Sequence, residues 1–173
     1  MPIDFNDLDV VSAAAGLKFA LIVPCNMCPA ATVAVREKKP FMQFFRSFLK
    51  SLPFEQYIGE LQSRLRKQGV DTKVFRSNLY HQWFMCMWTS AQRKKLQAAV
   101  KQYEAVIVLG CDSATETVRD AVKSTDCKVI EGMEVTGIMN ATLRFHWPCN
   151  VSFENCRTIP ISQQKKEKVS LVA

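Results

Sequence analysis

Four cysteines carry the most reactive side chains in this 173-residue chain. They stand where predicted strands give way to loops or helices, and we call them the four site cysteines: Cys25, Cys28, Cys86 and Cys111. A cysteine thiolate is a soft ligand that binds zinc at about 2.3 Å and holds iron in iron–sulfur clusters. If the fold brings the four together, the sequence predicts a site for a metal ion or a cluster.

The spacing of these cysteines leaves several kinds of chemistry open. The Cys25-x-x-Cys28 pair is typical of a redox dithiol, because this motif lowers thiol pKa values. Zinc sites usually contain a second close pair, whereas Cys86 and Cys111 are 25 residues apart. Iron–sulfur clusters accept one close pair and two remote cysteines. The remaining alternative is that Cys86 and Cys111 are small buried apolar residues, which is common for free cysteine.

Apolar segments predict the elements that position these cysteines. The predicted strands lie at 18–24, 71–76, 103–110, 127–130 and 141–145, and the predicted helices at 54–68, 77–102 and 113–124. Strands alternating with helices predict one α/β domain over 1–173, with a three-layer, Rossmann-like parallel sheet. The polar, charged residues 162–173 predict a flexible tail.

The order of the strands gives a reason for two of the cysteines to meet. In a 2-1-3-4 sheet the strand order reverses between the first and third strands, which end at Cys25 and Cys111. Ligands of such sheets bind outside the carboxyl ends of the strands at this reversal. A helix beginning near Ser113 would also direct its positive end toward the same crevice. The sequence therefore predicts a site at this edge.

Four features follow one another along the chain in a particular order. They are a strand ending in Cys-x-x-Cys (23–28), a helix with Leu-Gln-Ser-Arg-Leu (61–65) before a Gly-Val strand, the isolated Cys86, and Tyr-Glu-Ala-Val-Ile-Val-Leu-Gly-Cys (103–111). A Gly-Ile-Met-Asn-Ala-Thr turn (137–142) comes later. Over residues 18–145 this order resembles the small iron–sulfur subunit of the methylenetetrahydrofolate reductase of acetogenic bacteria.

The resemblance implies one [4Fe–4S] cluster held by the four site cysteines. It also implies an electron-transfer or accessory subunit of anaerobic one-carbon metabolism, rather than a complete enzyme, with a flavoprotein or a methyltransferase as the partner subunit. The chain departs from the family at Thr32, where a third cysteine is expected, and it lacks the cysteine-rich tail. A second cluster is therefore not expected, and the roles of Cys149 and Cys156 stay open.

Two alternatives come from other functional classes. In a thiol–disulfide oxidoreductase, Cys25 would attack and Cys28 would resolve the mixed disulfide. In a zinc-stabilised interaction module, the cysteines would hold a structural ion with no redox role.

Composition limits the partners and the location. The net charge is +7, with basic residues concentrated at 36–50, 62–75, 93–101 and 157–168. This charge suits an acidic protein or an anionic ligand as the partner. No nucleic-acid-binding motif is present, so nucleic acid is not an expected partner.

No Gly-rich phosphate loop occurs, which counts against independent use of NAD or ATP. No apolar run reaches the roughly 18 residues of a membrane span, and the acidic N-terminus favours a cytoplasmic location.

One further segment combines aromatic and basic residues. Residues 36–50 place Phe41, Phe44, Phe45 and Phe48 at helical spacing among cations. The pattern predicts a helix that packs on the sheet or offers a docking face to a partner subunit.

Overall fold

A parallel sheet of four strands lies at the centre of this fold, in a computed structural model that describes residues 2–43, 51–76, 84–147 and 149–161. In spatial order the strands are β4 (Asp71–Val74), β2 (Phe19–Pro24), β5 (Ala105–Leu109) and β6 (Lys128–Glu131). This is the expected 2-1-3-4 order. Five of the six residues of β2 and all five of β5 are buried, as in parallel strands covered on both faces.

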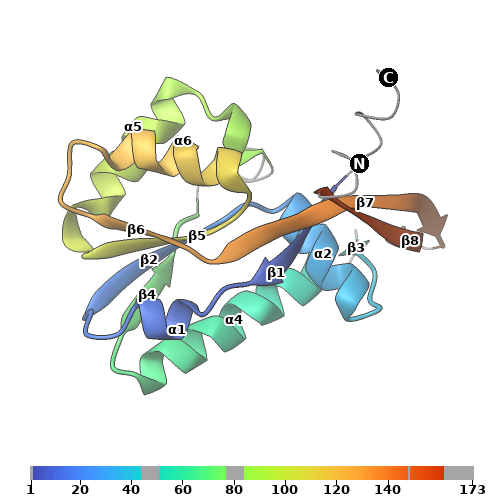
Figure 1. Cartoon of the computed structure of the whole chain (residues 1–173), viewed down its shortest axis with the longest axis horizontal. Coiled ribbons are helices and arrows are strands. Elements are labelled where there is room, and N and C mark those ends of the chain that lie inside the picture. Colours follow the sequence, from blue (N-terminus) through green and yellow to red (C-terminus); the bar gives the residue numbers. More distant parts are fainter. Residues whose placement is uncertain (1, 44–50, 77–83, 148, 162–173) are drawn as a thin grey trace, which may run out of the picture.

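Helices cover both faces of the parallel sheet (Figure 1), which confirms the α/β class. One face packs against α1 (Val10–Ala13), α2 (Cys28–Arg36) and α4 (Leu52–Lys67); the other packs against α5 (Ser90–Ala99), the short helix η3 (Val100–Gln102) and α6 (Asp112–Val122). Alternate residues of β2 divide between the two cores, because successive side chains of a strand point to opposite faces. No helix in the described segments is long and apolar enough to cross a membrane.

The sequence signals of α4 agree with its structure. Ser51 is the N-cap and Pro53 lies in the first turn, where its missing N–H costs no hydrogen bond. The apolar residues at helical spacing are buried: Phe54, Ile58, Leu61 and Leu65. The chain leaves the helix at Gly69, whose φ of +82° favours glycine.

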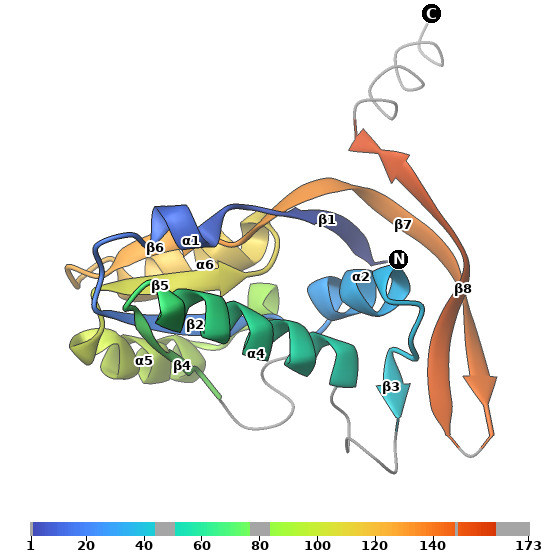
Figure 2. The ribbon, with the colours of Figure 1, turned by 90° about the horizontal axis from the view of Figure 1, so that it is seen from below.

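A second sheet was not expected from the sequence. It is antiparallel, with the order β1 (Ile3–Asp7), β7 (Met133–His146), β8 (Asn150–Pro160) and β3 (Met42–Gln43). The predicted strand at 141–145 therefore belongs to the β7–β8 hairpin and not to the parallel sheet. Figure 2 shows this hairpin extending away from the parallel sheet, beside α2 and β3.

The predicted helix at 77–102 is wrong in its middle. Residues 84–89 leave the α-helix and contain only the short 3-10 helix η2 (Met85–Met87). α5 begins afterwards with a capping box, in which the side chain of Gln92 accepts a hydrogen bond of 2.6 Å from the backbone N–H of Thr89. Thr-x-x-Gln is a recognised start signal, so the sequence contained the information for this boundary.

The aromatic segment around Phe41 also differs from its prediction. Phe41 is only 2% exposed, and its ring packs on Phe153 with centroids 5.1 Å apart. The next two residues form β3 rather than a helix. Phe41 is therefore part of the core and not of a docking face. The predictions for Phe44, Phe45, Phe48 and the tail 162–173 concern residues outside the described ranges.

Candidate functional site

The carboxyl ends of β2 and β5 bring Cys25 and Cys111 to the same edge of the parallel sheet. Cys25 follows β2 directly, and its backbone N–H donates to the carbonyl of Leu109 at 2.9 Å. Gly110 permits close packing here, because an added Cβ would lie 3.6 Å from the Cβ of Cys25 and 2.7 Å from that of Ala114. The two strand ends therefore lie side by side, as the strand order predicts.

Cys28 and Cys111 both stand at helix N-termini. Cys28 is the first residue of α2, and Cys111 is the N-cap of α6, one position before the predicted cap. Backbone N–H groups at a helix N-terminus create a positive potential that favours negative charge. At Cys28 burial outweighs this effect and raises the pKa of the thiol.

Cys86 reaches this edge from the segment between β4 and α5. Its neighbours anchor the segment, because Met85 is fully buried and Trp88 is 5% exposed. The rings of Trp88 and Phe75 pack with centroids 5.8 Å apart. η2 also contacts α6, the helix that begins after Cys111.

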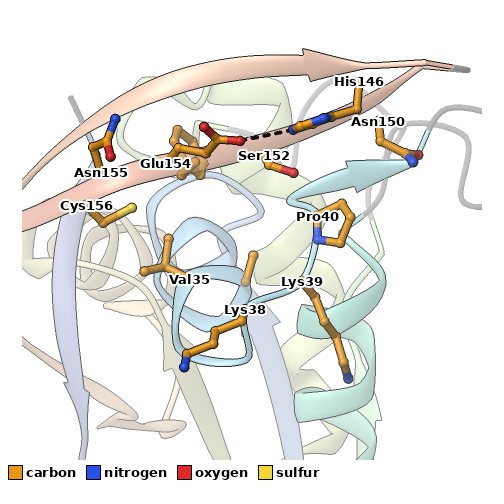
Figure 3. A pocket seen from close by; sticks show the side chains of 12 residues that line it. Val35, Lys38, Lys39, Pro40, His146, Asn150, Ser152, Glu154, Asn155 and Cys156 are labelled. Atoms are coloured by element: carbon orange, nitrogen blue, oxygen red, sulfur yellow. Dashed lines mark ion pairs between the residues drawn. The ribbon is translucent and has the colours of Figure 1, made fainter.

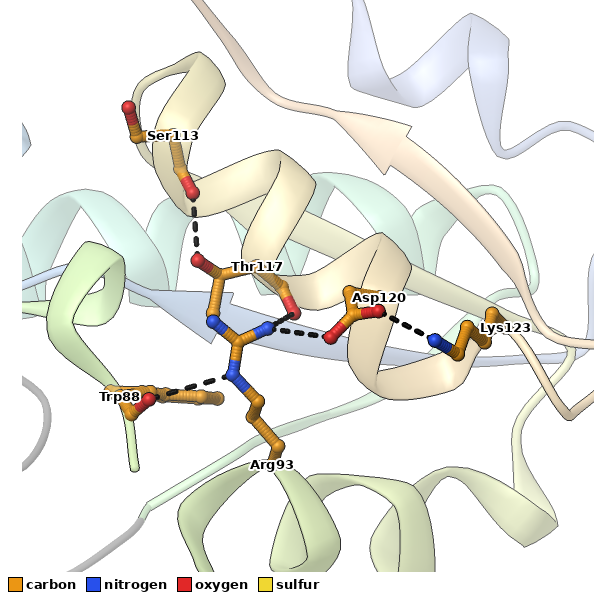
Figure 4. A network of polar contacts seen from close by, with 6 residues as sticks. All are labelled: Trp88, Arg93, Ser113, Thr117, Asp120 and Lys123. Carbon is orange, nitrogen blue, oxygen red and sulfur yellow. Dashed lines mark hydrogen bonds and ion pairs between the residues drawn. The ribbon is translucent and has the colours of Figure 1, made fainter. Parts of the chain in front are cut away.

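Arg93 connects the Cys86 segment to α6 (Figure 4). Its Nε donates to the carbonyl of Trp88 at 3.4 Å, and its Nη1 donates to the carbonyl of Thr117 at 3.4 Å. The same Nη1 forms an ion pair of 2.9 Å with Asp120, which Lys123 also contacts at 2.8 Å. Sequence reasoning missed this role, since nothing in a basic helical segment distinguishes Arg93 from its solvated neighbours.

The electrostatics link the four thiols to one another. Burial raises the pKa of Cys25 to about 11; backbone hydrogen bonds from Met85 and Met27 oppose this rise, and charge on Cys28 and Cys111 adds to it. Burial also raises the pKa of Cys28, to which charge on Cys111 and Cys86 contributes. The packing agrees with this link, because Cys25, Met85 and Cys111 contact one core, Cys28 and Cys111 contact the other, and η2, which contains Cys86, contacts α6.

The gathered thiols are not arranged around a single ion. Within the described ranges, no group of three or more His, Cys, Asp or Glu side chains is placed to hold a metal ion. Cys25 is buried, Cys28 and Cys111 are half-buried, and Cys86 is exposed. Solvent and any partner therefore reach this region most easily at Cys86.

The other three cysteines lie elsewhere. Cys127 immediately precedes β6, at the opposite end of the parallel strands, and burial raises its pKa. Cys149 and Cys156 are exposed residues of the β7–β8 hairpin. All seven cysteines are free thiols.

The burial of Cys25 decides what the Cys25/Cys28 pair can do by itself. A nucleophilic thiol needs a pKa near or below the ambient pH, whereas Cys25 stays protonated at pH 7. Coordination to a metal would deprotonate it, because a metal-bound thiol gives up its proton. The chain matches no protein-family model, no curated protein and no solved structure.

Proposed function

We propose that the chain is a small iron–sulfur protein whose four site cysteines hold one [4Fe–4S] cluster. The observation that carries the proposal is that the ends of β2 and β5 bring Cys25, Cys28 and Cys111 together, and that Met85, the neighbour of Cys86, packs in the same cluster as Cys25 and Cys111. Four soft donors with backbone N–H groups directed at a sulfur match the ligands and hydrogen bonds that tune such clusters. When bound, a cluster supplies one-electron transfer.

The chain's own residues would shield one side of this site and expose the other. Cys25 and Met85 are buried and exclude water from the inner side. Phe84 and Met87, on either side of Cys86 in the sequence, are 47% and 75% exposed. An exposed apolar margin of this kind suits a partner that docks at the site.

On this basis we propose an electron-transfer or accessory subunit of anaerobic one-carbon metabolism, with a flavoprotein or a methyltransferase as its partner. The resemblance to the small subunit of acetogen methylenetetrahydrofolate reductase supports this assignment, and with it a Rossmann-like relationship of the parallel sheet. A single cluster is proposed because Thr32, at the position of the family's third cysteine, is fully buried. Its hydroxyl donates to the carbonyl of Ile3 at 3.1 Å and so has a structural role.

The alternative of a thiol–disulfide oxidoreductase has less support. Its attacking residue, Cys25, is 6% exposed and has a pKa of about 11, so both access and ionisation are poor. A zinc-stabilised module would use the same donors and is distinguished by experiment.

Anaerobic reconstitution with ferrous iron and sulfide tests the proposal. The expected product is a brown protein with about four irons per chain. Alanine substitution of any one site cysteine should lower the iron content, whereas Cys127→Ala, at the other end of the strands, should not. If the protein takes up no iron, or if Cys127→Ala loses as much iron as the site variants, the proposal is wrong.

Two other outcomes would establish the alternatives. A colourless protein that retains one zinc ion would identify the zinc-stabilised module. A colourless, metal-free protein whose disulfide reductase activity disappears in Cys25→Ser would identify the oxidoreductase.

A further inference from the structure

The β7–β8 hairpin ends in a two-stranded ribbon that protrudes from the rest of the fold. β1 pairs with β7 as far as Ile138, and β3 pairs with β8 only at Asn150 and Val151. Between Asn140 and His146, β7 pairs with β8 alone within the described segments. Figure 2 shows the ribbon extending away from the parallel sheet. The end of the hairpin is therefore a convex part of the surface.

Three large apolar side chains are exposed on this ribbon. Leu143 is 48% exposed, Phe145 is 73% exposed and Trp147 is 92% exposed. Leu143 and Phe145 point to the same face of β7, because alternate residues of a strand share a face. Trp147 follows in the turn and is the most exposed large apolar side chain in the segments that the structure describes. Exposed apolar surface gathered in one place marks an interaction site.

The opposite face of the ribbon is polar and has contacts within the chain. The carboxylate of Glu154 lies 3.2 Å from His146 (Figure 3) and 3.3 Å from Arg144. His146 and Glu154 also line a cavity of about 540 Å³, whose other wall includes Lys38 and Pro40. The face that is open to a partner is therefore the apolar one.

The size and shape of this apolar face favour a lipid surface over a second protein. Aromatic side chains offer roughly 150–250 Å² each, so the exposed parts of the three residues amount to roughly 450 Å². A stable protein interface needs about 800 Å² from each partner, with close shape complementarity. The boundary between headgroups and acyl chains accepts a small apolar group without a shaped groove, and binding grows with the area inserted.

The charge of the chain favours an anionic membrane. The net charge is +7. Among the described residues from 140 to 160, Arg144 and Arg157 outnumber Glu154, the one carboxylate. Basic residues near an anionic lipid surface add electrostatic attraction to the insertion of apolar side chains. Tryptophan is also enriched at membrane interfaces, where its ring lies at the level of the headgroups.

We propose that the end of the β7–β8 hairpin binds the surface of an anionic membrane. Leu143, Phe145 and Trp147 insert at the boundary between headgroups and acyl chains, and the positive charge of the chain holds them there. The contact is peripheral, because the hairpin enters the interface without crossing the bilayer. The proposal does not depend on the cluster, because the site cysteines take no part in it.

Sedimentation with sucrose-loaded vesicles tests the proposal. The full chain is kept reduced, so that Cys149 in the turn cannot link two molecules. It is mixed with vesicles of phosphatidylcholine alone or of equimolar phosphatidylcholine and phosphatidylserine. We expect saturable binding to the anionic vesicles and binding about tenfold weaker or less to the neutral ones.

Phe145→Ser and Met87→Ser form a matched pair of variants, because the two side chains are 73% and 75% exposed on different elements. Both substitutions are at the surface and should leave the fold intact, which circular dichroism checks. The affinity for anionic vesicles should fall about tenfold in Phe145→Ser and in Trp147→Ser, because each loses the insertion of one aromatic ring. It should not change in Met87→Ser.

Four results would each overturn the proposal. They are no binding to anionic vesicles, equal binding to neutral vesicles, unchanged affinity in Phe145→Ser, and an equal loss in Met87→Ser. Light scattering gives a further check on the occupant. A dimer of the natural chain that Phe145→Ser dissociates would assign the apolar face to a second copy of the chain, and the membrane proposal would then be wrong.

Discussion

Alkaline pH should destabilise the reduced, metal-free protein through Cys25. Burial raises the pKa of this thiol from 9.0 to about 11 in the folded state, so the folded chain holds the proton more tightly than the unfolded chain does. The stabilisation is fully present below pH 9 and is lost as the pH rises through 11. Two pH units correspond to about 3 kcal/mol, a large part of the 5–15 kcal/mol typical of a domain.

Urea unfolding at pH 8, 9, 10 and 11, with a phosphine reductant and a chelator present, measures this loss. The natural chain and Cys25→Ala are compared, because their difference cancels every lysine and tyrosine that titrates in both. Between pH 8 and pH 11 the free energy of unfolding of the natural chain should fall by about 2 kcal/mol more than that of the variant, because Cys25 is only half ionised in the folded state at pH 11. Cys127→Ala is the matched control and should retain most of the natural pH dependence, since Cys127 is only half-buried.

The result that would refute this reasoning is equal pH dependence in the natural chain and in Cys25→Ala. Cys25 would then ionise as easily in the folded state as in the unfolded state. The argument against a nucleophilic Cys25 would fail with it. The thiol–disulfide oxidoreductase would become the better proposal.

Three further predictions concern packing, two of them at the candidate site and one in the second sheet. Gly110→Ala should lower the free energy of unfolding by about 1–3 kcal/mol, because the added Cβ would lie 2.7 Å from the Cβ of Ala114 in α6. Gly59→Ala is the control, because it has open space around it in α4. It should raise the free energy of unfolding by about 0.5–1 kcal/mol in the same urea assay. Arg93→Met should speed amide hydrogen exchange around Cys86 without changing exchange in β2, and unchanged exchange would show that Arg93 does not position this segment. Gly137→Ala should destabilise the chain by about 1–3 kcal/mol, because its Cβ would contact a carbonyl oxygen of β8, while iron uptake should persist.

Much of the parallel sheet could be predicted from the sequence. The runs that became β2 and β5 are apolar throughout, and both central strands of such a sheet are buried on both faces. The second sheet could not be predicted, because β1 and β7 pair across more than a hundred residues and neither shows a clean alternation. Pairing of that kind depends on contacts between segments far apart in the sequence, which no local pattern encodes.

The candidate site, like the fold, could be predicted from the sequence only in part. The expected strand order gave a reason for Cys25 and Cys111 to meet at one edge, and the short Cys-x-x-Cys spacing brought Cys28 with them. Cys86 is different, because its approach depends on the break at 84–89, on the buried side chain of Met85, and on Arg93. Those contacts join residues distant in the sequence and leave no local pattern.

The sequence by itself thus determined the types of the reactive residues and the strands that end beside them, because apolar periodicity and strand ends are local properties. Only the tertiary structure decided that Cys25 is buried and protonated, that Cys86 lies at the exposed side, and that Lys38 lines a cavity against the β7–β8 hairpin. Burial, pKa and enclosed volume depend on what packs against a side chain from elsewhere in the chain. That information is absent from any single segment of the sequence.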